Sequence, residues 1–162
     1  RDMVLSGFFN SLGLWPHHKV TPKQKRRAHE ILRFLEIEHL ATRPLSAMSS
    51  GEQRRALIGR ALVHDPEVLI LDEPTNSLDP GAVHEFHIIL RKLIRSGKSL
   101  VLVTHQVADI LPEIKRVIMM KKGRIIADGP KEKILTSAAL TRLFGKHLKL
   151  IRKRQTYDLV SG

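Results

Sequence analysis

The stretch LILDEPTNSLDP, residues 69–80, decides how the rest of the sequence is interpreted. An apolar run ends in two adjacent carboxylates, Asp72 and Glu73, and a proline follows at once. Burying two acids at the end of a hydrophobic strand costs free energy unless a positive group compensates them. The stretch therefore implies a cation at this point of the fold, and the question is whether the chain carries the machinery to use it.

The composition of the chain fits a globular protein that attracts anions. Its 162 residues suit one domain, and 42% of them are hydrophobic. The absence of cysteine excludes disulfides and thiolate metal sites, which fits a reducing cytosol. A net charge of +12 attracts nucleotides, nucleic acids or acidic lipid headgroups, whereas an aromatic content of 4% disfavours a base-stacking surface. No apolar run reaches the roughly 18 residues of a membrane crossing, so we expect none.

Apolar periodicity and cap residues predict two main helices in the first part of the chain. Thr21 can cap a helix that begins at Pro22 and runs to about Leu40. A second helix begins at Ser49 or Ser50, because either serine has a capping-box partner three residues later. This helix stops at the His-Asp-Pro sequence that precedes the opening stretch.

Strands and helices alternate after this point. Residues 67–72 and 99–105 are short, almost entirely apolar runs between turn signals, as expected for parallel strands buried on both faces. A helix over residues 80–96 connects them, and Asp79 caps it. A short helix, a hairpin and two further short helices are predicted at residues 106–113, 115–129, 130–135 and 137–144. Helices that alternate with buried strands indicate the α/β fold class.

Three sequence motifs occur in order along this framework. They are MSSGEQRR at residues 48–55, LILDEPTNSLD at residues 69–79, and a strand that ends at His105. In this order and spacing they resemble the ATPase subunits of ATP-binding cassette (ABC) transporters, in which an LSGGQ-like signature precedes a Walker B strand, a D-loop and a switch histidine. The resemblance covers nearly the whole chain. It implies an α/β, P-loop NTPase-like ABC ATPase core with an α-helical subdomain.

The resemblance gives the two carboxylates of the opening stretch separate roles. It implies that Asp72, at the carboxyl end of its strand, faces through water the Mg²⁺ that accompanies ATP, an ion that prefers oxygen ligands. It makes Glu73 the general base that orients the attacking water, a role that contributes on the order of 10²–10⁴-fold. Without the resemblance, two surface acids at a strand-to-loop turn would explain the pair as well.

The signature lies at a predicted helix start, where unpaired backbone N–H groups and the helix dipole favour an anion. The resemblance implies that this segment binds the γ-phosphate of ATP held by a partner domain, through Ser49, Ser50, Gly51, Glu52 and Gln53. An ordinary helix cap explains both serines equally well. The sequence departs from the commonest family form at Met48, which replaces leucine, and at Ser50, which replaces a glycine.

Three further residues have both a structural and a functional interpretation. Asp79 can simply cap a helix, whereas the resemblance places Ser77 and Asp79 in a D-loop that crosses a dimer interface. His105 ends a buried strand and could be structural, whereas the resemblance makes it a catalytic contact of the γ-phosphate. Of the other histidines, His84 and His87 have helical spacing but no third ligand, so we expect no metal there.

A P-loop, Gly-x-x-x-x-Gly-Lys-Ser/Thr, does not occur in the sequence. The segment RSGKS at residues 95–99 contains the final Gly-Lys-Ser, but Lys92 stands where the first glycine is needed, and a helix precedes it where a strand should. We therefore interpret the chain as the C-terminal portion of an ABC ATPase, with the N-terminal β-rich and Walker A part missing. We expect that the chain on its own does not bind ATP tightly.

This interpretation divides the chain into three parts. Residues 1–65 form the helical subdomain that carries the signature, and residues 66–145 form the C-terminal part of the catalytic core. Residues 146–162 are expected to be a basic, disordered tail, because they show no clear period.

The resemblance implies an ATP-binding and ATP-hydrolysing subunit that energises a transmembrane ABC transporter, in our interpretation an importer, with ATP and Mg²⁺ as cofactors. Its expected partners are a second ABC ATPase domain in a head-to-tail dimer and a transmembrane permease, with no nucleic acid. Its expected place is cytoplasmic, peripheral at the inner face of the cell membrane. Two alternatives stay open: a soluble, non-transport ABC protein that acts on ribosomes or nucleic acid, which the +12 charge favours, and an inactive fragment.

Overall fold

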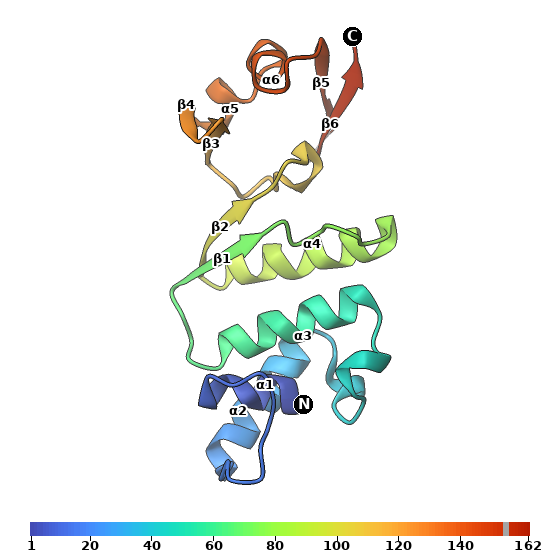
Figure 1. The fold of residues 1–162 in the computed structure, drawn as a ribbon, viewed down its shortest axis with the longest axis vertical. Helices are drawn as coiled ribbons and strands as arrows, with labels where there is room; N and C mark the ends of the chain where they lie inside the picture. The colour runs from blue at the N-terminus through green and yellow to red at the C-terminus, as the bar shows by residue number, and fades with distance from the viewer. Residues whose placement is uncertain (154–155) are drawn as a thin grey trace. The chain divides into compact units, whose positions relative to one another are not determined.

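The structure is a computed structural model that describes residues 1–153 and 156–162 (Figure 1). These residues form two compact units, Arg1–Val103 and Thr104–Gly162. The boundary between these units falls after the second predicted strand, and the signature helix contacts the helix that connects the two strands. The functional division near residue 65 stays a prediction. In the described residues, no helix combines the length and the apolar character that crossing a bilayer requires.

The first unit is mainly helical, with one pair of strands near its end. Its elements are α1 (Asp2–Ser6), η1 (Gly7–Phe9), α2 (Pro22–Phe34), η2 (Glu38–Leu40), η3 (Leu45–Ala47), α3 (Ser50–Leu62), β1 (Val68–Asp72), α4 (Pro80–Arg95) and β2 (Ser99–Val103). All helices and strands predicted for this part of the chain form, and the largest difference is that α2 ends earlier than expected.

Helix α2 starts where the sequence predicts and stops at a backbone reversal. The Gln24 amide donates to Thr21 Oγ1 at 3.3 Å, and Gln24 Oε1 accepts from the Thr21 amide at 2.8 Å. This capping box confirms the predicted start. The helix ends before Leu40 because Glu36 adopts a left-handed conformation, with φ 59°. The amides of Glu36 and Ile37 then close the last helical turn.

Helices α1, α2 and α3 meet at Gly59, in the middle of α3. A Cβ atom at this position would lie 3.0 Å from Val4 Cγ2 of α1 and 3.0 Å from Leu35 Cδ1 at the end of α2. The close approach explains why a glycine occupies a helix interior, where it costs about 1 kcal/mol relative to alanine. The absence of a side chain at Gly59 thus allows the three helices to pack closely.

Strands β1 and β2 pair in parallel, with Asp72 opposite Val103, and α4 is the crossover helix between them. The prediction of parallel strands is therefore confirmed. The prediction that both faces are buried is wrong, because only the leucine face of the pair is covered in the described residues. The opposite face exposes 50%, 71%, 47% and 50% of Val68, Ile70, Val101 and Val103.

The second unit consists of two antiparallel hairpins and short helices. Its elements are η4 (Val107–Asp109), β3 (Arg116–Lys121), β4 (Arg124–Pro130), α5 (Lys131–Ile134), α6 (Ser137–Phe144), β5 (Leu148–Lys153) and β6 (Thr156–Ser161). The predictions of the first hairpin and of the two short helices after it are confirmed. The helix predicted at 106–113 shortens to the single turn η4.

The prediction of a disordered tail at 146–162 is wrong for the described residues of that segment. Strands β5 and β6 pair antiparallel, with Leu150 opposite Leu159. Leu150, Tyr157 and Leu159 pack against a core of buried side chains from the rest of the unit, Val107, Met119, Leu135 and Leu140. The hairpin is hard to recognise in the sequence because the adjacent apolar pairs Leu150–Ile151 and Leu159–Val160 interrupt the apolar–polar alternation that marks a strand. Residues 154 and 155 lie outside the described residues.

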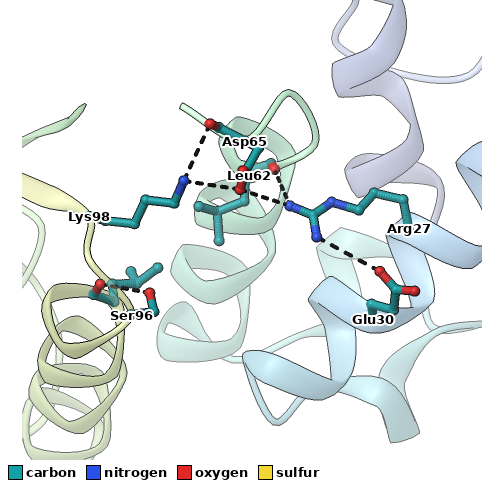
Figure 2. Close-up of polar contacts among 7 residues, drawn as sticks. Arg27, Glu30, Leu62, Asp65, Ser96 and Lys98 are labelled. Atoms are coloured by element: carbon teal, nitrogen blue, oxygen red, sulfur yellow. Dashed lines mark hydrogen bonds and ion pairs between the residues drawn. The ribbon is translucent and has the colours of Figure 1, made fainter. Parts of the chain in front are cut away.

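Asp65 joins three segments of the first unit that are far apart in the sequence (Figure 2). Its carboxylate lies 3.1 Å from Arg27 Nη2 on α2 and 3.0 Å from Lys98 Nζ, just before β2. Arg27 also donates to the Leu62 carbonyl at 3.5 Å, and Lys98 to the Asp65 carbonyl at 3.3 Å. The cations thus lie at the C-terminal end of α3, where the helix dipole favours positive charge. Lys98 of the RSGKS segment therefore has a structural role in this junction.

Replacing Asp65 should weaken this junction in a pH-dependent way. Lys98, and then Arg27, lower the pKa of Asp65, so its stabilisation is complete above the unfolded pKa of about 3.9 and is lost as the pH falls through the lower folded value. We expect Asp65→Asn to lower the melting temperature by about 2 °C at pH 7, measured by calorimetry. Glu67→Gln is the control. Equal effects of the two changes would contradict the role of Asp65.

The loop between η1 and α2 favours the neutral form of His18. The rings of Phe9 and His18 stack with centroids 4.2 Å apart, and the Trp15 amide donates to His18 Nδ1 at 3.2 Å. Partial burial, and to a lesser extent the neighbouring His17, lower the pKa of His18. Since only the neutral ring accepts a hydrogen bond at Nδ1 in this way, this contact is complete above the ordinary pKa of about 6.5 and is lost as the pH falls through the lower folded value.

Trp15 is the single tryptophan of the chain, so its fluorescence reports this loop directly. We expect its emission to shift to longer wavelength as the pH is lowered through the His18 titration, because the freed loop exposes the indole further. His18→Phe keeps an aromatic ring but removes the titration. His39→Gln, at an exposed histidine elsewhere in the unit, is the control. A His18→Phe variant that still titrates like the parent would rule out His18 as the cause.

Candidate functional site

The carboxyl ends of β1 and β2 lie at the same edge of the sheet, and the candidate site starts there. The Glu73 amide donates to the Val103 carbonyl at 2.8 Å, so the pairing continues one residue beyond Asp72. Parallel strands of an α/β fold present ligand-binding residues at this edge. The structure therefore brings the segment after Asp72 next to the end of β2.

Glu73 has an unusual backbone. Its φ of 42° lies in the left-handed region, which non-glycine residues adopt rarely and often at functional sites. The Asn76 side-chain amide donates to Glu73 Oε2 at 3.3 Å, and the Asn76 backbone amide donates to the Glu73 carbonyl at 3.1 Å. These contacts form a tight turn that directs the Glu73 carboxylate.

The two carboxylates differ in exposure. Asp72 is exposed, and Glu73 is half-buried. The expected cost of burying both acids therefore does not arise at Asp72, and that part of the sequence interpretation is wrong. The strand edge therefore presents the solvent-exposed carboxylate of Asp72 next to that of Glu73, which is held by its turn.

The D-loop leads from this turn into α4. Ser77 also has a left-handed backbone, with φ 65°. Asp79 Oδ1 accepts a hydrogen bond from the Ala82 amide at 3.0 Å, which confirms Asp79 as the cap of α4. Arg54 of α3 reaches the Asn76 carbonyl at 3.5 Å, so the signature helix and the D-loop are in contact.

The signature segment forms a complete capping box. The Glu52 amide donates to Ser49 Oγ at 3.3 Å, and the Ser49 amide donates to Glu52 Oε2 at 2.7 Å. Ser49 is thus the cap, and the alternative start at Ser50 with Gln53 is wrong, since the Gln53 side chain donates to the Met48 carbonyl instead. The hydrogen bond from the Ser49 amide is the main cause that lowers the pKa of Glu52. Both serines are exposed.

Gly51 has a packing role that the sequence does not reveal. It is buried, and a Cβ atom there would lie 3.1 Å from Ala82 Cβ at the start of α4. The absent side chain lets the first turns of α3 and α4 approach one another closely. The small residues Gly51 and Ala82 at this contact thus let the signature and the D-loop lie next to one another in the first unit.

His105 belongs to the second unit, in the segment that leads to η4, and its side chain is exposed. Thr104 Oγ1, next to it, donates to Asp109 Oδ2 at 2.6 Å and accepts from the Gln106 amide at 3.0 Å. Asp109 is only 1% exposed. Sequence reasoning missed both Thr104 and Asp109, and the available signal was an acid four residues after the histidine.

The described residues contain no group of three or more His, Cys, Asp or Glu side chains that could hold a metal ion. Asp72 alone offers an exposed carboxylate at the strand edge. Mg²⁺ in nucleotide sites keeps several waters and is bound by one or two carboxylates together with phosphate oxygens. The donor set therefore fits Mg²⁺ that arrives with a triphosphate, and does not fit a resident metal held by side chains alone.

Comparison with known proteins assigns the family. A family model described as ABC transporter matches residues 4–76. Nod factor export ATP-binding protein I of Neorhizobium galegae is 42% identical over 100 residues, which cover 62% of this chain and 29% of that protein. Energy-coupling factor transporter ATP-binding protein EcfA2 of Methanospirillum hungatei is 40% identical over 111 residues, 68% of this chain and 28% of that protein. The chain belongs to the ABC transporter ATP-binding proteins.

Solved structures of ABC ATPases confirm the α/β fold. A transporter assigned to the metal-chelate type, in an inward-facing conformation, matches with a TM-score of 0.82 at 26% identity, over 98% of this chain and 63% of that one. CbiO1 from Clostridium perfringens, part of the CbiONQ complex, matches with a TM-score of 0.69 at 30% identity, over 86% of this chain and 53% of that one. The chain thus spans less than two thirds of each of these four ABC proteins.

The contact between Gly51 and Ala82 can be measured by a double-mutant cycle. We expect Gly51→Ala to destabilise the protein by about 1 kcal/mol, because the new methyl group meets Ala82 Cβ in a tight contact. Ala82→Gly costs a similar amount through helix propensity. The double variant should be more stable by about 0.5–1 kcal/mol than the sum of the two single effects predicts, as measured by denaturant unfolding. Additive effects would show that the two helix starts do not press on one another.

Proposed function

We propose that the chain is part of an ATP-hydrolysing subunit that energises a transmembrane ABC transporter. The observation that carries the proposal is the strand edge, where the parallel pairing of Asp72 with Val103 joins the Walker B acids to the end of β2. Family membership supports it, because ABC ATPases bind ATP, typically with Mg²⁺, and hydrolyse it. The direction and cargo of transport are separate questions.

At the strand edge, Asp72 would hold Mg²⁺ through water, and the metal ion would neutralise phosphate charge. Glu73 would be the general base: its carboxylate takes the proton of the attacking water, and the hydrogen bond from Asn76 orients it. His105, which follows Val103 by two residues along the chain, would contact the γ-phosphate. The exposed side chain of His105 and the left-handed turn at Glu73 support these assignments.

The start of α3 would serve a second nucleotide. In the proposed head-to-tail dimer, the signature of one chain binds the γ-phosphate of ATP held by a second ABC ATPase domain, through Ser49, Ser50, Gly51, Glu52 and Gln53. The exposed serines at a helix N-terminus support this role, since the backbone amides and the dipole favour an anion there. Gly51 is buried against α4, so only its backbone amide would contact the phosphate. Ser77 and Asp79 would contact the partner domain.

A transmembrane permease is the second proposed partner, at the cytoplasmic face of the membrane. The names of the relatives do not agree on direction, because one of them is named for export of Nod factor. Import stays our proposal on the likeness to the metal-chelate type transporter. Transport of labelled metal chelates into or out of vesicles that contain the assembled transporter would decide between the two directions.

Glu73→Gln in the assembled ATPase is the first test of the proposed chemistry. Glutamine keeps the size of the side chain but cannot take a proton, so we expect ATP to remain bound while hydrolysis falls at least 100-fold. Nucleotide retention and phosphate release measure the two effects. Glu67→Gln, before β1, is the matched control and should hydrolyse ATP normally. Hydrolysis retained in Glu73→Gln would remove Glu73 from the role of general base.

His105→Ala tests the second catalytic assignment. The side chain is exposed, so its removal should slow ATP turnover while the melting temperature stays within about 1 °C. Turnover and thermal unfolding are measured on the same preparation. A large fall in melting temperature would instead support a structural histidine.

A further inference from the structure

The Thr104 hydroxyl group makes two hydrogen bonds within the segment that carries the candidate histidine. Thr104 Oγ1 donates to Asp109 Oδ2 at 2.6 Å and accepts from the Gln106 amide at 3.0 Å. Thr104 and Gln106 are the two neighbours of His105 in the sequence. A single oxygen atom therefore ties the backbone on both sides of His105 to the same carboxylate.

That carboxylate is fixed in the interior of the second unit. Asp109 is 1% exposed, and a buried carboxylate is costly unless it accepts hydrogen bonds. The 2.6 Å distance from Thr104 Oγ1 lies at the short end of the range for O–H···O hydrogen bonds. Asp109 ends η4, whose first residue, Val107, belongs to the apolar core with Met119 and Leu135. The Thr104 hydroxyl is thus attached to the core, while His105 itself is exposed.

We propose that Asp109 and Thr104 are positioning residues for His105, which fix the backbone on either side of it and so restrict the orientation of its imidazole. The inference rests on the catalytic role proposed for His105 and deepens it. Neither positioning residue touches the nucleotide. The competing explanation is that the two residues only stabilise η4, with no effect on the histidine.

The chemistry makes the choice of residue at position 104 specific. The side chain must donate to a carboxylate and accept from an amide at the same time, which a hydroxyl can do. Valine has the same shape but can do neither, and serine retains both functions. Thr104→Val and Thr104→Ser are therefore a matched pair that separates the hydroxyl from the volume of the side chain.

The first experiment uses NMR of the histidine rings in the chain as it is. His105→Ala assigns the His105 signals among the nine histidines. We expect Thr104→Val to shift and broaden the His105 ring signals, and Thr104→Ser to leave them at their parent positions. The Met119 methyl signal monitors the core of the unit. Unchanged His105 signals in Thr104→Val would overturn the inference, and so would equal changes in both variants.

The second experiment measures ATP hydrolysis by the assembled ATPase. We expect Thr104→Val and Asp109→Asn to lower kcat on the order of 10- to 100-fold with little change in KM, and Thr104→Ser to restore kcat. A parallel fall in melting temperature without rescue by serine would favour the structural explanation and overturn the inference. If His105→Ala is impaired but Thr104→Val is not, positioning fails while the proposed function stands. If the parent protein hydrolyses no ATP, the proposed function fails, and the ring signals still decide whether Thr104 orients His105.

Discussion

The parallel pairing of β1 with β2 is the contact on which the rest of the candidate site depends. The register sets Asp72 opposite Val103, and the Glu73 amide extends it by one more hydrogen bond. Because side chains alternate between faces along a strand, a shift of one residue would exchange the covered and exposed faces and remove Glu73 from its partner. The turn at Glu73 and the D-loop after it begin at the edge that this pairing defines.

The sequence predicts the features of this fold that are local. Caps at Thr21, Ser49 and Asp79 start helices where expected, since each cap needs only neighbouring amides. The parallel strands and the alternation of elements follow from short apolar runs between turns. The early end of α2 was missed because the residue with the left-handed backbone is Glu36. A glycine at that position is the usual sequence signal for the end of a helix. The β5–β6 hairpin was missed because adjacent apolar residues break the alternation in both strands.

The candidate site was located by its motifs, but its supporting contacts were not. Family motifs identify Glu73 and His105 by order and spacing alone. The contact of Gly51 with Ala82, the turn at Glu73 and the burial of Asp109 depend on which segments meet in three dimensions. A sequence can show that a glycine or an acid is present, but not what faces it. For this reason the positioning residues emerge only from the structure.

The uncovered face of the β1–β2 pair affects how the chain associates with other molecules. Its exposed apolar side chains are all β-branched, and in the described part of the chain each strand leaves one edge without a partner strand. Extended, uncharged segments such as LVLV readily recruit further strands from other molecules, and the result is intermolecular aggregation. A segment or subunit that covers this surface would remove both the exposed apolar area and the open strand edges.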